Sequence, residues 1–207
     1  MNDKLPFSDA CERNKQPILE VLEKHLPNRG FVLEIGSGTG QHVVYFAEKM
    51  KNLKWQPSDV AENLPGLVAR IQTKGGDNIK PPIELDVLNE DAAAWPERVL
   101  SAAFSANTAH IMPWSTVRAM FSGVGKRLKE RGVFCLYGPF NERGKYTSDS
   151  NRVFDLQLKT QFTEMGLRDV QSLEALAKKN DMRLIDQVQM PANNQTLVFI
   201  RNDRLRR

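Results

Sequence analysis

The stretch that decides the fold is Phe31–Gly40, which reads Phe-Val-Leu-Glu-Ile-Gly-Ser-Gly-Thr-Gly. An apolar strand pattern ends in an acid and is followed by glycine at every second position. Glycine adopts backbone angles that a side chain would forbid, so Gly36, Gly38 and Gly40 allow backbone amides to approach a ligand closely. The amphipathic stretch after Gly40 predicts a helix, whose N-terminus supplies partial positive charge and free N–H groups.

The spacing of these glycines distinguishes two kinds of nucleotide site. The dinucleotide fingerprint is Gly-x-Gly-x-x-Gly, and its third glycine would fall at position 41, which is Gln41. The pattern Glu34-x-Gly36-x-Gly38-x-Gly40 instead resembles the first motif of the class I S-adenosylmethionine (SAM) methyltransferases. A NAD-linked oxidoreductase is therefore the disfavoured alternative. The plainest alternative is a tight strand-to-helix turn that binds nothing.

Length and composition favour one ordinary domain over residues 1–207, with a net charge of +4. No apolar run is long enough to span a membrane and the N-terminus lacks a signal-peptide pattern, so we expect a cytoplasmic protein that does not bind membranes. The two cysteines, Cys11 and Cys135, fit a reducing compartment. Neither they nor the three histidines have metal-ligand spacing, so we expect no metal site.

A cluster of arginines closes the chain. We interpret it as a solvated, frayed end, because no basic helix or interleaving of basic and aromatic residues accompanies it. Nucleic acid is therefore a disfavoured partner. The arginines are Arg201, Arg204, Arg206 and Arg207.

Strand and helix patterns alternate along the chain, which predicts an α/β fold with helices on both faces of a mostly parallel sheet. The short connection 190–195 forces the last two strands into an antiparallel hairpin, giving the seven-stranded, Rossmann-like sheet of class I methyltransferases. The segment 139–168 is long for a crossover and carries its own helix, so we interpret it as a lid-like insertion. We expect helices at about 14–26, 40–50, 64–72, 117–128, 150–163 and 172–179, and strands at 31–35, 53–57, 83–85, 102–111, 133–137, 183–189 and 196–200.

Acids follow two successive strands at the edge where open parallel sheets bind ligands. Asp59 could accept from both ribose hydroxyls. Asp86 could accept from the adenine amine, and the Val87 amide could reach a ring nitrogen. Each acid alone is also explained as a helix N-cap, but with the glycine turn and Glu34 they predict SAM binding. Before the first helix, Arg13 could reach the SAM carboxylate and Asn14 could cap the helix.

The end of the fourth strand, 107–114, normally faces the methyl acceptor. Asn107 could hold the methionine part of SAM. His110 could act as a general base, because its ordinary pKa lies near the working pH. Trp114 could line the pocket or contact a cation through its ring face. The plainer alternatives are a His110 that bonds a backbone carbonyl and a Trp114 in the core. Tyr137 could bond substrate or be a buried tyrosine with a satisfied hydroxyl.

Polar residues in the last third of the chain are candidates for acceptor binding. Asn151 and Asp155 in the excursion, and Arg168 after it, are predicted to contact substrate, while Asp169 is a natural N-cap. The pair Asn193–Asn194 lies at the hairpin turn on the ligand side, although asparagine's tolerance of positive φ offers a purely conformational explanation. The predicted catalytic residues are His110, Tyr137 and Asn107. The predicted substrate-binding residues are Trp114, Asn151, Asp155, Arg168, Asn193 and Asn194.

Over about residues 5–201, the chain resembles the methyltransferase-like 26 family, a domain-of-unknown-function group of bacterial and animal proteins. The resemblance implies a class I fold and SAM dependence, and it implies no particular substrate. Many members carry Trp-Gly-Ile-Arg-Asp where this chain has Met165–Asp169, so the acceptor specificity would differ here if that tryptophan lines the pocket. The motifs that carry the resemblance are Arg13–Lys15, Glu34–His42, Trp55–Asp59, Asn107 with His110 and Pro113–Trp114, Tyr137–Phe140, Ser150–Asn151 with Phe154–Asp155, Arg168–Asp169 and Met190–Asn194.

The sequence therefore predicts a SAM-dependent methyltransferase that acts on a small-molecule acceptor. Two alternatives remain open. One is a protein that binds SAM without transferring its methyl group. The other is a protein or RNA methyltransferase, which would need an exposed basic or extended groove. The run 107–114 is not the Asn-Pro-Pro-aromatic motif of amino-directed nucleic-acid methyltransferases, which lowers that option. The sequence does not indicate an oligomeric state.

Overall fold

The computed structural model describes residues 5–89 and 95–203, which form a seven-stranded sheet in the order β3-β2-β1-β4-β5-β9-β8. The first five strands are parallel, and β9 runs antiparallel to both of its neighbours. This confirms the predicted fold class, including the C-terminal antiparallel hairpin. The strands are β1 (Gly30–Ile35), β2 (Leu53–Asp59), β3 (Ile83–Glu84), β4 (Leu100–Ala106), β5 (Leu128–Gly138), β8 (Met182–Met190) and β9 (Asn194–Arg201).

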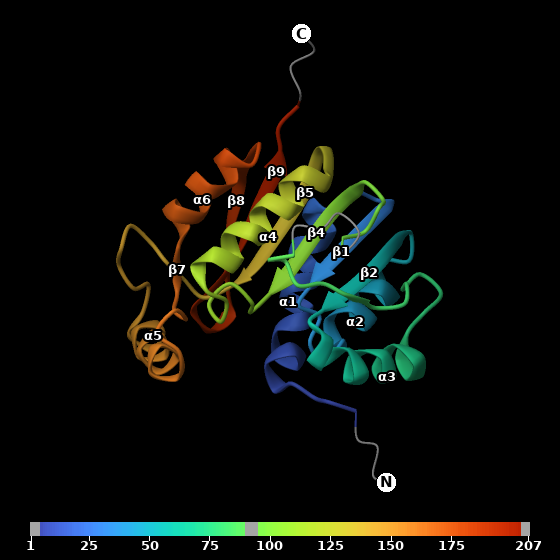
Figure 1. The fold of residues 1–207 in the computed structure, drawn as a ribbon, viewed down its shortest axis with the longest axis horizontal. Helices are drawn as coiled ribbons and strands as arrows, with labels where there is room; N and C mark the ends of the chain where they lie inside the picture. Colours follow the sequence, from blue (N-terminus) through green and yellow to red (C-terminus); the bar gives the residue numbers. More distant parts are fainter. Residues whose placement is uncertain (1–4, 90–94, 204–207) are drawn as a thin grey trace.

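Helices cover both faces of the sheet (Figure 1). One face packs against α1 (Asp9–His25), α2 (Gln41–Lys49) and α3 (Leu64–Lys74), and the other against α4 (Trp114–Arg127) and α6 (Val170–Lys179). Helix α5 (Asp149–Gln161) lies beyond one end of the sheet, within the excursion (Figure 1). The remaining elements are η1 (Ala61–Asn63), η3 (Pro191–Asn193), β6 (Phe140–Asn141) and β7 (Arg168–Asp169).

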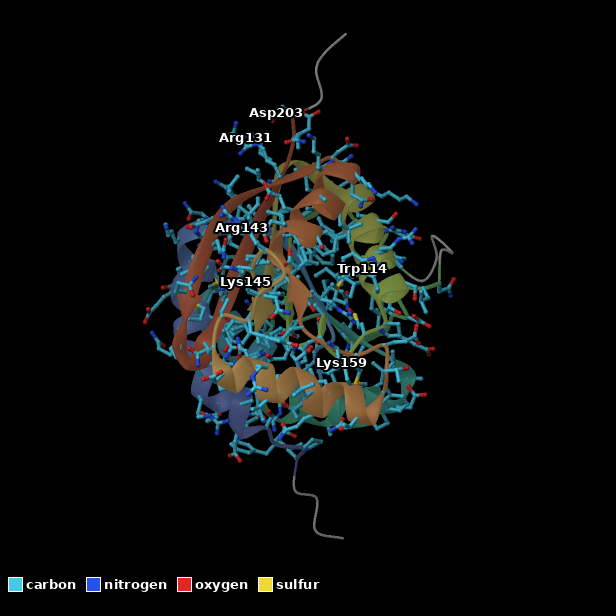
Figure 2. All side chains as sticks on the ribbon, turned by 90° about the vertical axis from the view of Figure 1, so that its left-hand side faces the viewer. Trp114, Arg131, Arg143, Lys145, Lys159 and Asp203 are labelled. Carbon is cyan, nitrogen blue, oxygen red and sulfur yellow. The ribbon has the colours of Figure 1, made fainter. Side chains whose placement is uncertain are left out.

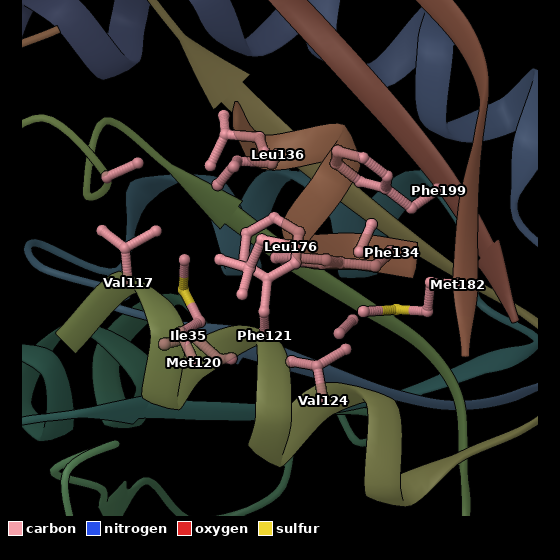
Figure 3. Close-up of a cluster of buried hydrophobic side chains, with 14 of the residues drawn as sticks. Ile35, Val117, Met120, Phe121, Val124, Phe134, Leu136, Leu176, Met182 and Phe199 are labelled. Atoms are coloured by element: carbon pink, nitrogen blue, oxygen red, sulfur yellow. The ribbon is translucent and has the colours of Figure 1, made fainter. Parts of the chain in front are cut away.

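Three phenylalanines form the centre of the core under α4 (Figure 3). Phe134 and Phe199 face each other across the β5–β9 pair, and the ring of Phe121 meets each of them edge-on at 5.3 Å. All three side chains are fully buried. Edge-to-face pairs add to the free energy gained from burying the rings, so this cluster holds the reversed strand β9 against the parallel sheet.

A second aromatic cluster lies on the opposite face and fixes the helix that follows the glycine turn. Phe46 of α2 contacts Phe104 edge-on at 5.4 Å and Trp55 at 5.9 Å. His42, one turn earlier in α2, stacks on Phe46 with the ring centroids 5.3 Å apart. The start of α2 is thereby anchored to β2 and β4, which holds the turn before it at the sheet edge.

The first helix begins earlier than predicted. Its N-cap is Ser8, whose hydroxyl accepts from the amide of Cys11, so the prediction that Asn14 caps this helix was wrong. Pro17 favours a start near position 14, because proline is best tolerated in a first turn. In the structure the helix continues through Pro17, which has no N–H to donate to the carbonyl of Arg13. Asn14 is buried inside the helix and bonds His42 instead.

Three other details differ from the predictions. The fourth strand ends at Ala106 and not near position 111, because Asn107 adopts φ 59° and turns the chain off the sheet. The pair β6–β7, which brings together the two ends of the excursion, was not predicted. Arg201 is not part of a frayed tail, since it is buried in β9 and donates to the carbonyl of Leu128. Arg204, Arg206 and Arg207 lie outside the described residues.

The end of the molecule that carries Arg131 and Asp203 lies away from α5 (Figure 2). These two side chains form an exposed ion pair of 3.6 Å. Among the described residues, no helix has the length and apolar character needed to cross a bilayer.

Candidate functional site

The glycine turn is built as its spacing predicts. Gly36, Gly38 and Gly40 have φ values of 72°, 51° and 73°, which side chains rarely adopt. The amide of Gly36 donates to the carbonyl of Ser58 at 3.0 Å, and a Cβ at Gly36 would lie 2.5 Å from Thr108. A Cβ at Gly38 would meet nothing within 4 Å, so bare backbone faces open space at this position.

Asp59 ties this turn to the end of β2. One carboxylate oxygen accepts from the Gly38 amide at 2.6 Å, and the other accepts from the Val60 amide and the Asn63 side chain, both at 2.8 Å. Asp59 is not a helix N-cap, since the N-cap residues of η1 and α3 are Val60 and Asn63, and its side chain lines a cavity. The carboxylate is held in one orientation at the mouth of the glycine turn.

A cavity of about 1000 Å³ opens at the carboxyl ends of β1, β2 and β4. Pockets that hold drug-sized ligands have volumes of roughly 300–1,000 Å³, so this cavity has room for a nucleoside cofactor and a second small molecule. Most of the predicted site residues lie on its wall. They are Arg13, Gly36, Gly38, Asp59, Asp86, Val87, Asn107, His110, Asn151, Asn193 and Asn194.

The other predicted site residues belong to the described part of the chain but do not line this cavity. Gly40 is the N-cap of α2 and has a left-handed φ, and a Cβ there would lie 2.8 Å from Leu67. Tyr137 is buried and shares a side-chain hydrogen bond with Asn14. This matches the plainer alternative, a buried tyrosine with a satisfied hydroxyl. The complete set outside the cavity wall is Glu34, Gly40, Tyr137, Trp114, Asp155 and Arg168.

The carboxyl group of Glu34 lies buried behind the turn. Its pKa is raised to about 8, first by burial, which disfavours the charged form, and further by the nearby charge of Asp59, against a hydrogen bond from Ser37. Oε2 has no hydrogen-bond partner among the described residues. Glu34 is therefore largely protonated at neutral pH, and it carries no full negative charge into the site.

Asp86 and Val87 form the end of the cavity next to β3. The carboxylate of Asp86 accepts from the Leu88 amide at 2.9 Å, which closes a local turn, and its side chain is exposed. Val87 is buried beside it. An acceptor carboxylate and a backbone amide therefore lie next to each other here, as the sequence predicts for adenine.

The cavity wall contains a histidine of α2, facing α1, that the sequence analysis did not select. His42 Nε2 lies 2.7 Å from Asn14 Oδ1, and since an amide oxygen can only accept, Nε2 carries the proton. Burial lowers the pKa of His42 to about 4, so its ring is neutral at pH 7. Arg13, one residue before Asn14, is exposed at the cavity and has no ion-pair or hydrogen-bond partner among the described residues.

His110 lies on the loop that follows β4 and faces the cavity. Burial and the positive charge of Arg168 lower its pKa to about 4. Neither ring nitrogen has a hydrogen-bond partner in the part of the chain that the structure describes, so the plainer alternative, in which His110 bonds a backbone carbonyl, does not hold. Phe154 of α5 meets its ring edge-on at 5.3 Å. Asn107 lines the same cavity and donates its backbone N–H to the carbonyl of Tyr137 at 2.9 Å.

Arg168 and Asp155 do not line the cavity, and their side chains bond the segments that form its wall. Arg168 Nε donates to the carbonyl of Ala109 at 2.9 Å, and its terminal nitrogen donates to the carbonyls of Met112 and Glu164. The cation lies 5.9 Å from the ring of Trp114, which is partly exposed at the start of α4 (Figure 2). Trp114 therefore contacts a cation, as predicted, but that cation is Arg168.

Asp155 is buried and its carboxylate is fully engaged within the protein. It accepts from the Tyr146 hydroxyl at 2.7 Å, from Lys159 at 2.6 Å and from the Leu167 amide at 2.7 Å. Lys159 lies on α5, one turn after Asp155, and its side chain is half exposed (Figure 2). Asp155 thus joins α5 to the segment that precedes Arg168. Met165, in the place of the family's tryptophan, is not on the cavity wall either.

Hydrogen bonds join α5 to the tip of the β8–β9 hairpin. The side chain of Asn151 donates to the carbonyl of Asn193 at 2.9 Å, and that of Asn193 donates to the Ser150 hydroxyl at 3.0 Å. At the other end of the excursion, the Gly166 amide donates to the carbonyl of His110 at 2.9 Å. The excursion is therefore bonded to both neighbouring parts of the cavity wall.

Some wall residues gave no signal in the sequence. Cys11 and Thr116 come from the first turns of the amphipathic helices α1 and α4. His42 follows the glycine motif, and its selection would have needed the position of α1. Phe154 reads as part of the apolar stripe of α5, and only the packing of that helix brings it to His110.

Three solved methyltransferase structures share this fold. An O-methyltransferase family protein from Burkholderia thailandensis is 15% identical with a TM-score of 0.79, and the match covers 95% of this chain and 59% of that one. Human N-acetylserotonin methyltransferase in complex with SAM is 13% identical with a TM-score of 0.78, and the match covers 94% of this chain and 53% of that one. CalO1, a methyltransferase in calicheamicin biosynthesis solved with S-adenosylhomocysteine (SAH), is 16% identical with a TM-score of 0.72. That match covers 91% of this chain and 54% of CalO1.

This chain spans between half and two thirds of the length of those three proteins. At such low identity the likeness establishes the Rossmann-like methyltransferase fold. The sequence model of one family, described as "Protein of unknown function (DUF938)", matches residues 5–201, nearly the whole chain. The protein therefore belongs to the DUF938 family.

Proposed function

We propose that this protein is a SAM-dependent methyltransferase that acts on a small molecule. The observation that carries the proposal is the glycine turn bonded to the Asp59 carboxylate beside a cavity large enough for two ligands. The solved structures of similar fold include complexes with SAM and with SAH. The resemblance to methyltransferase-like 26 sequences fits the same activity, and we propose membership of that narrower group.

The residues around the turn suit SAM. Gly38 leaves room where a side chain would project, and Asp59 presents fixed carboxylate oxygens to the ribose hydroxyls. Asp86 and the Val87 amide would bind adenine. Arg13 has no partner among the described residues and would pair with the cofactor's carboxylate. When bound, SAM supplies an electrophilic methyl group on a sulfonium.

The acceptor would lie between Asn107, His110 and Phe154. Methyl transfer is an in-line displacement, so positioning the acceptor accounts for much of the rate. His110 is neutral at pH 7 because its pKa is about 4. A weak base suffices here, because an O–H or N–H group becomes strongly acidic as its heavy atom is methylated. His110 would accept that proton, and α5 would exclude water from the site.

The competing functions fit less well. A protein that only binds SAM has no use for the rest of the cavity, which extends past Asn107 to Phe154 and Asn194. A nucleic-acid substrate would need a basic groove, and Arg13 is the only lysine or arginine among the described residues on the cavity wall. We further propose that residues 1–207 act as one domain in the cytoplasm, where Cys11 and Cys135, both free thiols, would stay reduced.

Calorimetric titration with SAM, SAH and NAD tests the cofactor. We expect SAM and SAH to bind, NAD not to bind, and the Asp59→Ala variant to lose SAM and SAH. The Asp77→Ala variant is the matched control, since Asp77 is an exposed acid outside the cavity. Absence of SAM binding, or binding that is indifferent to Asp59, would contradict the proposal.

A further inference from the structure

The acceptor end of the cavity carries asparagine side chains whose orientation is set by their partners. Asn151 is buried on the cavity wall, and its Nδ2 donates to the Thr147 hydroxyl and to the carbonyl of Asn193, both at 2.9 Å. A carbonyl oxygen only accepts, so the nitrogen must face it. Asn151 Oδ1 therefore points away from these partners, and it has no donor among the described residues.

Asn194 shows the same arrangement at the tip of the hairpin. Its Nδ2 donates to the carbonyls of Pro191 and Ala192, at 3.2 and 3.3 Å. Both partners are carbonyls, so Oδ1 is again the free atom of a side chain on the cavity wall. The tip itself is strained, because Ala192 and Asn193 both have φ 57°. Residues held in this region are strained and concentrate at functional sites.

The same end of the cavity contains an imidazole and apolar surface. His110 has two ring nitrogens without a partner in the described part of the chain, and Phe154 and Met112 lie on the wall beside it. Arg13 is the only lysine or arginine among the described wall residues, and the proposed function assigns it to the carboxylate of SAM. Nothing else on the described wall would neutralise an anion.

We infer that the methyl acceptor is a small molecule with an apolar ring or face, at least two O–H or N–H donor groups, and no carboxylate or phosphate. Its donors would bond Asn151 Oδ1 and Asn194 Oδ1, and the group to be methylated would lie against His110. An anion would bring its charge against two amide oxygens, and Arg168, the cation behind His110, is bonded to backbone carbonyls and does not line the wall to pair with it. This inference rests on the proposed function and specifies the substrate class of the same site.

Three ring compounds of the same substitution pattern test the inference. Resorcinol carries two O–H donors, 1,3-dimethoxybenzene carries acceptors only, and isophthalate carries two negative charges. Each is titrated into the protein saturated with SAH, and binding is followed by saturation-transfer NMR. An acceptor atom left unpaired on burial loses free energy, so resorcinol should bind about tenfold or more tightly than either of the other two.

Two variants localise the effect. Asn194→Ala and Asn151→Ala each remove one free oxygen and should weaken resorcinol binding several-fold without changing SAH affinity. Asn194→Ala alters an incompletely buried turn, so it keeps the test valid if Asn151→Ala does not fold. Asn28→Ala, an exposed asparagine just before β1 at the other end of the sheet, is the control and should change nothing.

The outcomes separate the two proposals. If SAH binds but isophthalate or 1,3-dimethoxybenzene binds as tightly as resorcinol, the substrate class is wrong and the proposed function stands. The substrate class is also wrong, and the proposed function again stands, if resorcinol does not bind or binds Asn194→Ala as tightly as the wild type. If SAH itself does not bind in the absence of any probe, the proposed function fails and the inference fails with it.

Discussion

Arg168 Nε donates to the carbonyl oxygen of Ala109 at 2.9 Å, directly before His110 in the chain. The same guanidinium reaches the carbonyls of Met112 and Glu164, and the Gly166 amide bonds the carbonyl of His110. The loop that carries His110 is therefore held from behind by the end of the excursion. A residue predicted to touch substrate instead positions the residue that faces the cavity.

Replacing Arg168 should separate its charge from its geometry. Arg168→Gln removes the positive charge that helps to lower the pKa of His110, so that pKa should rise toward its ordinary value. Arg168→Lys keeps the charge but loses the planar fork of donors, so the pKa should stay low while the loop loosens. An NMR titration of His110 measures both variants, with exposed Arg183→Gln as the control. Identical titrations in the two Arg168 variants would contradict this account.

The glycine turn allows a matched pair of substitutions. Gly38 and Gly144 both have positive φ, at 51° and 73°, and a Cβ at either would meet nothing within 4 Å. Alanine at each should therefore cost a similar amount of stability, about 1–2 kcal/mol. Only Gly38 lines the cavity, so only Gly38→Ala should weaken SAM binding, by tenfold or more since about 1.4 kcal/mol suffices. Equal SAM affinities in the two variants would exclude the turn as the cofactor site.

Glu34 gives a prediction for stability against pH. Its folded-state pKa of about 8 lies above its ordinary value of 4.5, so between these values the folded protein binds more protons than the unfolded chain. The contribution of Glu34 to the free energy of unfolding therefore falls as the pH rises from about 4.5 to 8. Glu34→Gln should be more stable than the wild type at pH 8, and the difference should shrink toward pH 5.

Urea unfolding at several pH values measures this difference. Glu62→Gln, an exposed acid for which the structure gives no hydrogen bond or ion pair, is the control and should show no such trend. A Glu34→Gln variant whose stability follows that of the wild type at every pH would mean that Glu34 is ionised in the folded protein.

The sequence predicted those site residues whose position follows from standing at the end of a single strand. The glycine turn, Asp59, Asp86 and Asn107 each lie where a strand leaves the sheet, and the parallel topology alone brings such residues to one edge. The start of α1 was missed because Pro17 favours a helix that begins near Asn14, whereas Ser8 caps the helix six residues earlier. Neighbouring-residue patterns cannot show which of two start signals the packing will select.

The directions of the side chains in the excursion could not be predicted from the sequence, for a different reason. Asp155 and Asn151 lie one helical turn apart on the buried side of α5, yet Asn151 faces the cavity and Asp155 bonds Leu167 and Lys159 behind it. That division depends on how α5 docks, which long-range hydrogen bonds such as Asn151 to Asn193 decide. The same docking brings Phe154 to His110.

The role of His110 as a proton acceptor gives the last prediction. His110→Ala should lose most of its turnover, while its SAM affinity should stay at the wild-type value because His110 lies at the acceptor end. With the folded-state pKa at about 4, the imidazole is already unprotonated at pH 5. The wild-type rate should therefore hold level from pH 8 to about pH 5 and should not fall near pH 6.5, where an ordinary histidine takes up its proton.

SAH release in the presence of a methyl acceptor measures both the turnover of His110→Ala and the pH dependence of the wild-type rate. The control is His25→Ala, since His25 lies outside the cavity and bonds Asp186. A rate that halves near pH 6.5 would contradict the lowered pKa of His110. A His110→Ala variant with unchanged turnover would remove His110 from the proton transfer.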